Sequence, residues 1–194
     1  MARSKQFEEN AVLEKAMKLF WEQGYEKTSM QDLVENMGIH RRSLYDTFSD
    51  KRTLFLKAVE RFDNRVDTWL KSGVDRSETA RGALRFIFDF MIYGQEDAPP
   101  GCMIVNSAVE LAARDPEIDA KTQQGFAKME HLLEGIIARG QRDGEFNTQQ
   151  EAKLYAEFLH NSLVGLRVLA RTTAPKEKLE RIAAMSLSLL EKGS

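Results

Sequence analysis

The sequence predicts an all-α fold of about nine helices. Apolar residues recur every three or four positions along the 194 residues, and no segment shows the strict alternation of a half-buried strand. With only 4 prolines, 12 glycines and no low-complexity tract, the chain has few interruptions, so disorder is expected only at its ends. Hydrophobic residues at 42% and charged residues at 30% are typical of a globular protein with a buried core.

Glycines and short polar residues delimit the first four helices. Gly24 follows the first apolar stripe as a C′ glycine, Thr28 or Ser29 caps the second helix, and Gly38 makes the turn to the third. The fourth helix has roughly 20 residues and would extend about 30 Å, enough to bridge two subdomains. These helices are expected at about 7–23, 30–37, 40–48 and 50–72.

Start signals also define the remaining helices. Asp75 with Glu78, and Thr148 with Glu151, have the spacing of capping boxes. Asp115 precedes a proline at a first helical position, which is a strong start signal. These helices are expected at about 77–93, 102–114, 116–142, 152–171 and 175–191.

The helices group into two predicted domains. Residues 1–50 are expected to form an N-terminal three-helix domain, and residues 51–194 a larger helical domain. The formal net charge is −2, but residues 39–57 carry +3, which leaves −5 for the remainder. A basic segment in an otherwise acidic chain favours a protein that binds nucleic acid in a defined orientation. Random clustering of charged residues on a solvated surface would give the same net charges.

Several protein classes are disfavoured. The single cysteine, Cys102, excludes an intrachain disulfide framework, and no stretch approaches the roughly 20 apolar residues of a membrane span. The start of the chain lacks the apolar core of a signal peptide, so a cytoplasmic protein is expected. Glu157 and His160 have the spacing of half a di-iron site, but the second pair is missing. No phosphate loop, nucleophile elbow or zinc motif occurs, so neither an enzyme, nor a metal, nor a cofactor is expected.

Residues 28–51 indicate a helix-turn-helix that binds double-stranded DNA. Arg41 lies in the first turn of the expected recognition helix, where an arginine can bond guanine in the major groove. Hydroxyls at the start of the preceding helix, with Tyr45 and Lys51, would grip phosphates. The expected DNA contacts are Thr28, Ser29, His40, Arg41, Arg42, Ser43, Tyr45 and Lys51.

The last two helices indicate a homodimer. Apolar residues go most of the way round the helix at 152–171, and the helix at 175–191 carries more than one apolar stripe. A four-helix interface with a second copy of the chain would bury these surfaces, and a thick core within one copy is the alternative. The expected interface residues are Leu163, Leu166, Ile182, Met185 and Leu189.

Residues from about 9 to 57 resemble the N-terminal domain of the TetR/AcrR family of transcriptional regulators. The segment 100–111 resembles one branch of that family. The departures are Val34, His40 and Arg42, where many members have other residues, so operator preference cannot be carried over. The motif consists of Phe20, Gly24, Tyr25, Thr28, Ser29, Gly38, Ile39, Ser43, Leu44, Tyr45, Phe48 and Lys51.

The resemblance implies a nine-helix homodimer that binds a pseudo-palindromic operator, acts as a repressor and is released by a small-molecule effector. It also implies an effector pocket in the larger domain, although each of its candidate residues suits ordinary core equally well. Cys102 is either a reactive thiol or a small buried residue. The candidate pocket residues are Phe62, Trp69, Phe86, Phe90, Met103, Asn106, Glu110, Phe126, Met129, Tyr155, Phe158 and Asn161.

A protein of another class remains as the alternative. An all-α carrier of small molecules, or a bundle enzyme, would use the N-terminal helices only as structural elements. The identity of the effector, the operator and the regulated genes is not encoded in any motif.

Overall fold

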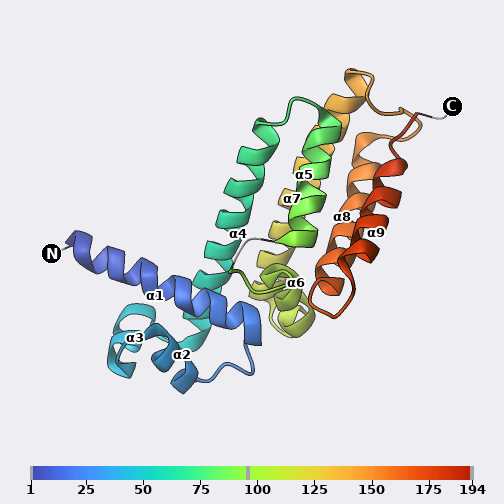
Figure 1. Cartoon of the computed structure of the whole chain (residues 1–194). Helices are drawn as coiled ribbons and strands as arrows, with labels where there is room; N and C mark the ends of the chain where they lie inside the picture. Colours follow the sequence, from blue (N-terminus) through green and yellow to red (C-terminus); the bar gives the residue numbers. More distant parts are fainter. Residues whose placement is uncertain (1, 95–96, 193–194) are drawn as a thin grey trace. The chain divides into compact units, whose positions relative to one another are not determined.

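The computed structural model describes residues 2–94 and 97–192. Within these ranges it contains nine α-helices and one π-helical segment and no strand, which confirms the predicted all-α class (Figure 1). The elements are α1 (Ala2–Gln23), α2 (Met30–Met37), α3 (Arg41–Phe48), α4 (Lys51–Asp75), α5 (Ala80–Tyr93), α6 (Met103–Ser107), η1 (Ala108–Ala112), α7 (Pro116–Arg142), α8 (Ala152–Leu169) and α9 (Lys176–Ser188).

The chain divides into two compact units. Unit 1 comprises Met1–Arg65 and Cys102–Thr122, and unit 2 comprises Val66–Gly101 and Gln123–Ser194. Unit 1 thus contains more than the predicted N-terminal domain of residues 1–50, because the first part of α4 and a segment from the middle of the chain pack with it. The helices α4 and α7 each contribute residues to both units.

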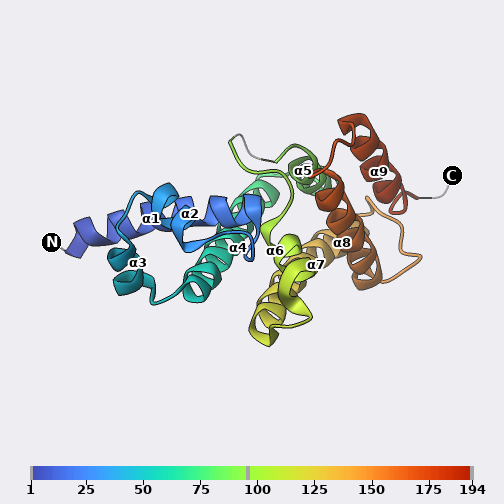
Figure 2. The ribbon, with the colours of Figure 1, turned by 90° about the horizontal axis from the view of Figure 1, so that it is seen from below.

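Unit 1 is built on aromatic and aliphatic side chains of α1 to α4. The helix α2 lies against α1, and α3 lies against α2 (Figures 1 and 2). The Phe20 and Phe55 rings meet edge to face with 5.1 Å between their centroids, and the Trp21 and Phe62 rings do so at 4.8 Å. Edge-to-face contacts of this kind stabilise the fold beyond the burial of the rings, so they hold α1 against the first half of α4.

Unit 2 has its own apolar core. The helices α5, α8 and α9 pack against one another (Figure 1). Side chains of α7 complete the core. Phe88 and Leu159 are fully buried in it. The start of α5 is capped twice, by the Thr79 hydroxyl, which accepts from the Gly82 amide, and by the Glu145 carboxylate, which accepts from the Ala80 and Arg81 amides.

Some helix ends differ from the predictions. The predicted capping box at Asp75 is wrong because α4 continues through that residue, and Thr79 caps α5 instead. The predicted box at Thr148 is also wrong, since Glu151 is the N-cap of α8 and makes no side-chain cap bond. The start at Asp115 is confirmed, because its carboxylate accepts from two backbone amides in the first turn of α7.

The middle of the chain is less regular than predicted. The single helix expected over residues 102–114 is a one-turn α-helix followed by the π-helix η1. A π-helical turn inserts one extra residue into a helix and so changes the direction in which the following side chains project. None of the helices in the described ranges is both long enough and apolar enough to span a bilayer.

Two glycines on α7 offer a matched test of the core of unit 2. A Cβ added at Gly140 would lie 2.2 Å from the Phe146 ring and 2.9 Å from Ala80 Cβ. We expect Gly140→Ala to lower the free energy of unfolding by about 1–3 kcal/mol through overpacking. Gly135→Ala is the control, because its Cβ would meet no heavy atom within 4 Å and should stabilise the helix by up to about 1 kcal/mol. Urea denaturation measures both, and equal midpoints for the two variants would contradict this packing.

Candidate functional site

Two eight-residue helices, α2 and α3, form the helix-turn-helix of unit 1. Ser29 caps α2, where its hydroxyl accepts from the Asp32 amide while the Asp32 carboxylate accepts from the Ser29 amide. Hydrogen bonding to the Asp32 carboxylate, from the Ser29 side chain first and then from its backbone amide, lowers the pKa of Asp32. Gly38 ends α2 with φ of +70°, a conformation that favours glycine, and its amide donates to the Val34 carbonyl. The helix α2 is therefore fixed by local hydrogen bonds at both of its ends.

The helix α3 has one buried face and one exposed polar face. Leu44 and Phe48 are buried at 0% and 1% exposure and hold the helix against unit 1. The residues predicted to contact DNA from this helix, together with its N-cap, lie on the other side and are all exposed: His40, Arg41, Arg42, Ser43 and Tyr45. Such a face is free to enter a major groove.

The two exposed arginines of α3 differ in the side chains that they contact. The Arg41 guanidinium lies 3.5 Å from the Tyr45 hydroxyl and 5.9 Å from the centre of that ring. Arg42 faces Asp46 at 3.8 Å, in a pair whose side chains are 92% and 71% exposed and which therefore adds little stability. Arg41 thus lies against an aromatic side chain of its own helix, whereas Arg42 is held only by an exposed ion pair.

The loop between α1 and α2 carries two more residues predicted to contact DNA, Thr28 and Ser29, and Lys51 at the start of α4 is a third. The Ser29 hydroxyl is exposed, whereas Thr28 is fully buried and donates to the Gly24 carbonyl at 2.6 Å. The structure therefore gives the Thr28 side chain a part in shaping the loop. Lys51 Nζ lies 4.3 Å from the centre of the Tyr25 ring, which orients the ammonium by a cation–π contact.

A neighbouring cation of α4 is neutralised within unit 1. The Arg52 guanidinium donates to the Asp115 carboxylate at 3.1 Å and lies 2.7 Å from the Glu117 carboxylate. The Arg52 bond lowers the pKa of Asp115 and raises that of the guanidinium. Lys51 has no such carboxylate partner among the described ion pairs.

The Arg52–Asp115 pair gives a pH prediction with a defined sign. A carboxyl whose pKa is lowered in the folded state stabilises the protein above the ordinary value of about 4, and this is lost as pH falls through the folded pKa. We expect Arg52→Gln to raise the pKa of Asp115 towards the ordinary value, since it removes the main cause of the shift. Carbon-13 NMR titration of the carboxyl measures this, and an unchanged pKa in Arg52→Gln would refute the assignment.

Comparisons with known proteins agree with this geometry. Residues 12–58 match the family model described as bacterial regulatory proteins, tetR family, and residues 81–185 match the tetracyclin repressor-like C-terminal domain. The chain belongs to the TetR family. It is therefore a helix-turn-helix transcriptional regulator, and the relatives it matches are regulators rather than enzymes.

Relatives of similar length are known among TetR-family regulators. The chain is 32% identical to an uncharacterised regulator of Bacillus subtilis strain 168, YezE, over 98% of this chain and 100% of that one. It is 33% identical to the repressor ComR of Escherichia coli K12, over 96% of this chain and 90% of that one. The structure of a CifR cysteine mutant with 26-base-pair operator DNA has a TM-score of 0.83, with 24% identity over 93% and 95% of the two chains.

The residues proposed to line an effector pocket fall into both units of this TetR-family chain. In unit 2, Trp69 stacks on Phe86 with 4.6 Å between the ring centroids and lies 4.3 Å from Phe90. Phe126 lies 5.3 Å from the His160 ring, and His160 Nδ1 is 2.8 Å from a Glu130 carboxylate oxygen. Met129 is half-buried against the same core.

Other predicted pocket residues have different neighbours. The Tyr155 hydroxyl donates to Asn147, while Phe158 and Asn161 are exposed on α8. In unit 1, Phe62 packs on Trp21 and Met103 is buried at 1% exposure. Asn106 and Glu110 bond backbone groups near the end of α1, which no local pattern in the sequence reveals.

The predicted dimer residues need one correction. Leu163 and Leu166 are 2% and 1% exposed and belong to the core of a single copy, so they do not face a partner. Their side chains point inward because they lie on the buried stripe of α8. Ile182 is half-buried, whereas Met185 and Leu189 on α9 are 73% and 46% exposed.

An exposed apolar stripe runs along the opposite face of α8. Its members recur at spacings of three and four, as one face of a helix requires. Leu154, Phe158 and Val168 are each about half exposed, and Met185 on α9 and Leu189 at its C-cap add apolar surface. The stripe on α8 consists of these three apolar residues, with Asn161 and Gly165 between them on the same face. We refer to it below as the α8 stripe.

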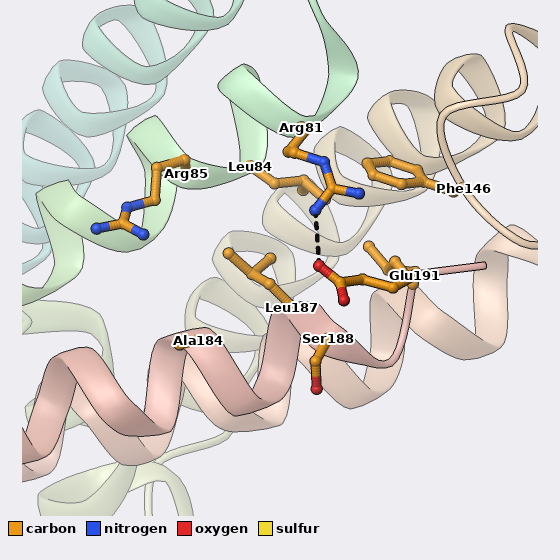
Figure 3. Close-up of a pocket in the computed structure, with 9 residues that line it drawn as sticks. Arg81, Leu84, Arg85, Phe146, Ala184, Leu187, Ser188 and Glu191 are labelled. Atoms are coloured by element: carbon orange, nitrogen blue, oxygen red, sulfur yellow. Dashed lines mark hydrogen bonds and ion pairs between the residues drawn. The ribbon is translucent and has the colours of Figure 1, made fainter. Parts of the chain in front are cut away.

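A hollow of about 260 Å³ lies between α5 and α9 in unit 2 (Figure 3). Leu84, Phe146 and Leu187 line it with apolar surface. Arg81 is paired with Glu191 at 3.0 Å, and Arg85 with Asp89 at 3.1 Å. Since both guanidinium groups already have carboxylate partners, the hollow offers little charge to an anionic ligand.

Proposed function

We propose that this TetR-family regulator binds a pseudo-palindromic operator as a homodimer and represses transcription until a small-molecule effector releases it. The exposed polar face of α3, with Arg41 oriented against Tyr45 and an apolar face buried beneath, is the observation that carries the proposal. Two such helices would meet major grooves one turn apart, about 34–36 Å. The relative ComR is a transcriptional repressor, which supports repression by this chain.

The α8 stripe supports dimerisation. Its apolar residues have no partner among the described residues of one copy that would bury them, and a second copy would. Apolar residues of α9 extend the surface, which suits a four-helix interface. A regulator that binds chromosomal DNA works in the cytoplasm, and this is the location that we propose.

The aromatic cluster of Trp69, Phe86 and Phe90 supports an effector pocket in unit 2. These rings, together with Phe126 and Met129, favour a ligand with a flat apolar body. Effector binding need only favour the state without DNA by roughly 1–3 kcal/mol to weaken operator binding by about 5–150-fold.

A gel-shift titration at stated salt tests the proposal. The full chain is mixed with duplex DNA from its own promoter region and, separately, with a shuffled duplex of the same length. We expect tighter binding to the promoter by about 10³-fold or more, as is typical of specific regulators. Equal affinity for both duplexes would overturn the proposal and favour a helical carrier or bundle enzyme.

A further inference from the structure

Glu110 makes an unusual long-range contact inside unit 1. It lies on the π-helix η1, and its carboxylate accepts hydrogen bonds from the Tyr25 amide at 2.9 Å and the Glu26 amide at 2.8 Å. Both amides follow Gln23, the last residue of α1, and the Glu110 carboxylate is the acceptor for both of them. A carboxylate that accepts two backbone bonds holds a loop more firmly than neutral acceptors do.

The loop is shaped to receive this carboxylate. Gly24 has φ of +86°, and a Cβ at that position would lie 2.8 Å from Glu110 Oε2. Asn106, one turn before Glu110, donates to the Trp21 carbonyl at 3.4 Å. The nearby pair of Arg114 with Glu26 at 3.1 Å is exposed and adds little stability. Asn106 and Glu110 therefore hold the end of α1 and the loop.

The same loop presents groups proposed to contact DNA. The Tyr25 ring lies under the Lys51 ammonium and packs on Phe55 with 4.9 Å between the ring centroids. The loop then ends at Ser29, the exposed N-cap of α2. A shift of the Tyr25 backbone would move both the Lys51 ammonium and the start of α2.

We infer that Glu110 is a positioning residue for operator binding: it holds the loop of residues 24–29 so that Ser29 and Lys51 meet the phosphates. This inference rests on the proposed function. The Glu110 carboxylate projects from the π-helical turn η1. The segment Cys102–Thr122, which contains η1, belongs to unit 1, and unit 1 also contains the helix-turn-helix.

The variant Glu110→Gln has two effects that would change operator affinity in opposite directions. Removing a negative charge from a DNA-binding unit should tighten binding to a polyanion. Glutamine, however, has one acceptor oxygen, so one of the two amides loses its partner and faces an NH2 group. We expect operator binding about tenfold weaker in Glu110→Gln, because the loop populates its competent conformation less.

Glu26→Gln is the matched control. It removes one negative charge from the loop that Glu110 holds and breaks only the pair with Arg114, whose side chains are 60% and 58% exposed. Its operator affinity should equal that of the wild type or be slightly higher. In Glu110→Gln alone, the amide proton resonance of whichever residue, Tyr25 or Glu26, loses its acceptor should move upfield, which reports the lost bond directly.

Gly24→Ala provides a second measurement of the same contact. Its Cβ displaces the carboxylate, so Gly24→Ala should cost operator affinity in the wild-type background and cost less when combined with Glu110→Gln. Full additivity of the two substitutions, or equal affinities for Glu110→Gln and Glu26→Gln, would overturn the inference. A wild type without preference for its promoter DNA would instead overturn the proposed function.

Discussion

Phe158→Glu is expected to turn the proposed dimer into folded monomers and to weaken operator binding by about 10²–10⁴-fold. Phe158 is 49% exposed and lies at the middle of the α8 stripe, so the side chain contributes little to the core of one copy. A carboxylate there would be desolvated against its partner without a counter-charge, which costs several kcal/mol. Sedimentation velocity gives the oligomeric state, and a gel shift gives the affinity.

Two further variants make the dimer experiment decisive. Val109→Glu places the same charge at an apolar residue that is 83% exposed on η1, outside the α8 stripe, and should remain dimeric. Leu163→Glu should unfold the chain, because that side chain is 2% exposed in the core of unit 2. A Phe158→Glu protein that sediments as a dimer at micromolar concentration would rule out the α8 stripe as the interface.

Arg41→Ala should weaken binding to the best operator by about 1–3 kcal/mol and relax the preference at one base pair in each half-site. The reason is the orientation of its guanidinium beside the Tyr45 hydroxyl at the start of α3. Competition gel shifts with single-base operator variants measure the change in preference. Arg42→Ala is the neighbouring control, since its exposed pair with Asp46 leaves it less ordered and its effect should be smaller.

Lys51→Ala should act differently from Arg41→Ala. An ammonium on a phosphate weakens binding to all sequences alike, and its loss should reduce the salt slope of log K by about 0.9. Tyr45→Phe should also act uniformly, with a smaller loss because only a hydroxyl is removed. If Arg41→Ala, Lys51→Ala and Tyr45→Phe all weakened every duplex by the same factor, the base-reading role of Arg41 would be wrong.

Local chemistry could be predicted from the sequence wherever neighbours in the chain decide it. The glycine turn at Gly38, the cap at Ser29 and the start of α7 at Asp115 each depend on bonds within a few residues. The all-α class followed from the spacing of apolar residues, which records the burial of one helix face. The family was predicted from the same residues and is confirmed by both family models.

Contacts between distant residues could not be predicted. Asn106 and Glu110 look like polar pocket residues on one regular helix, but Glu110 lies on a π-helical turn and the partners of both residues lie about 85 positions earlier in the chain. On α8, apolar residues on several faces left the buried and exposed stripes indistinguishable, so Leu163 was assigned to the wrong one. Packing within unit 2 decides between them.

The two tryptophans of this chain lie in different compact units, Trp21 in unit 1 and Trp69 in unit 2. Trp21 is 4% exposed beside Phe62, whereas Trp69 is only partly buried and stacks on the rings proposed to meet the effector. The protein therefore carries an intrinsic fluorophore in each unit. With Trp21→Phe, quenching of the remaining emission would report effector occupancy, and with Trp69→Phe, emission would report changes around the end of α1, without any attached dye.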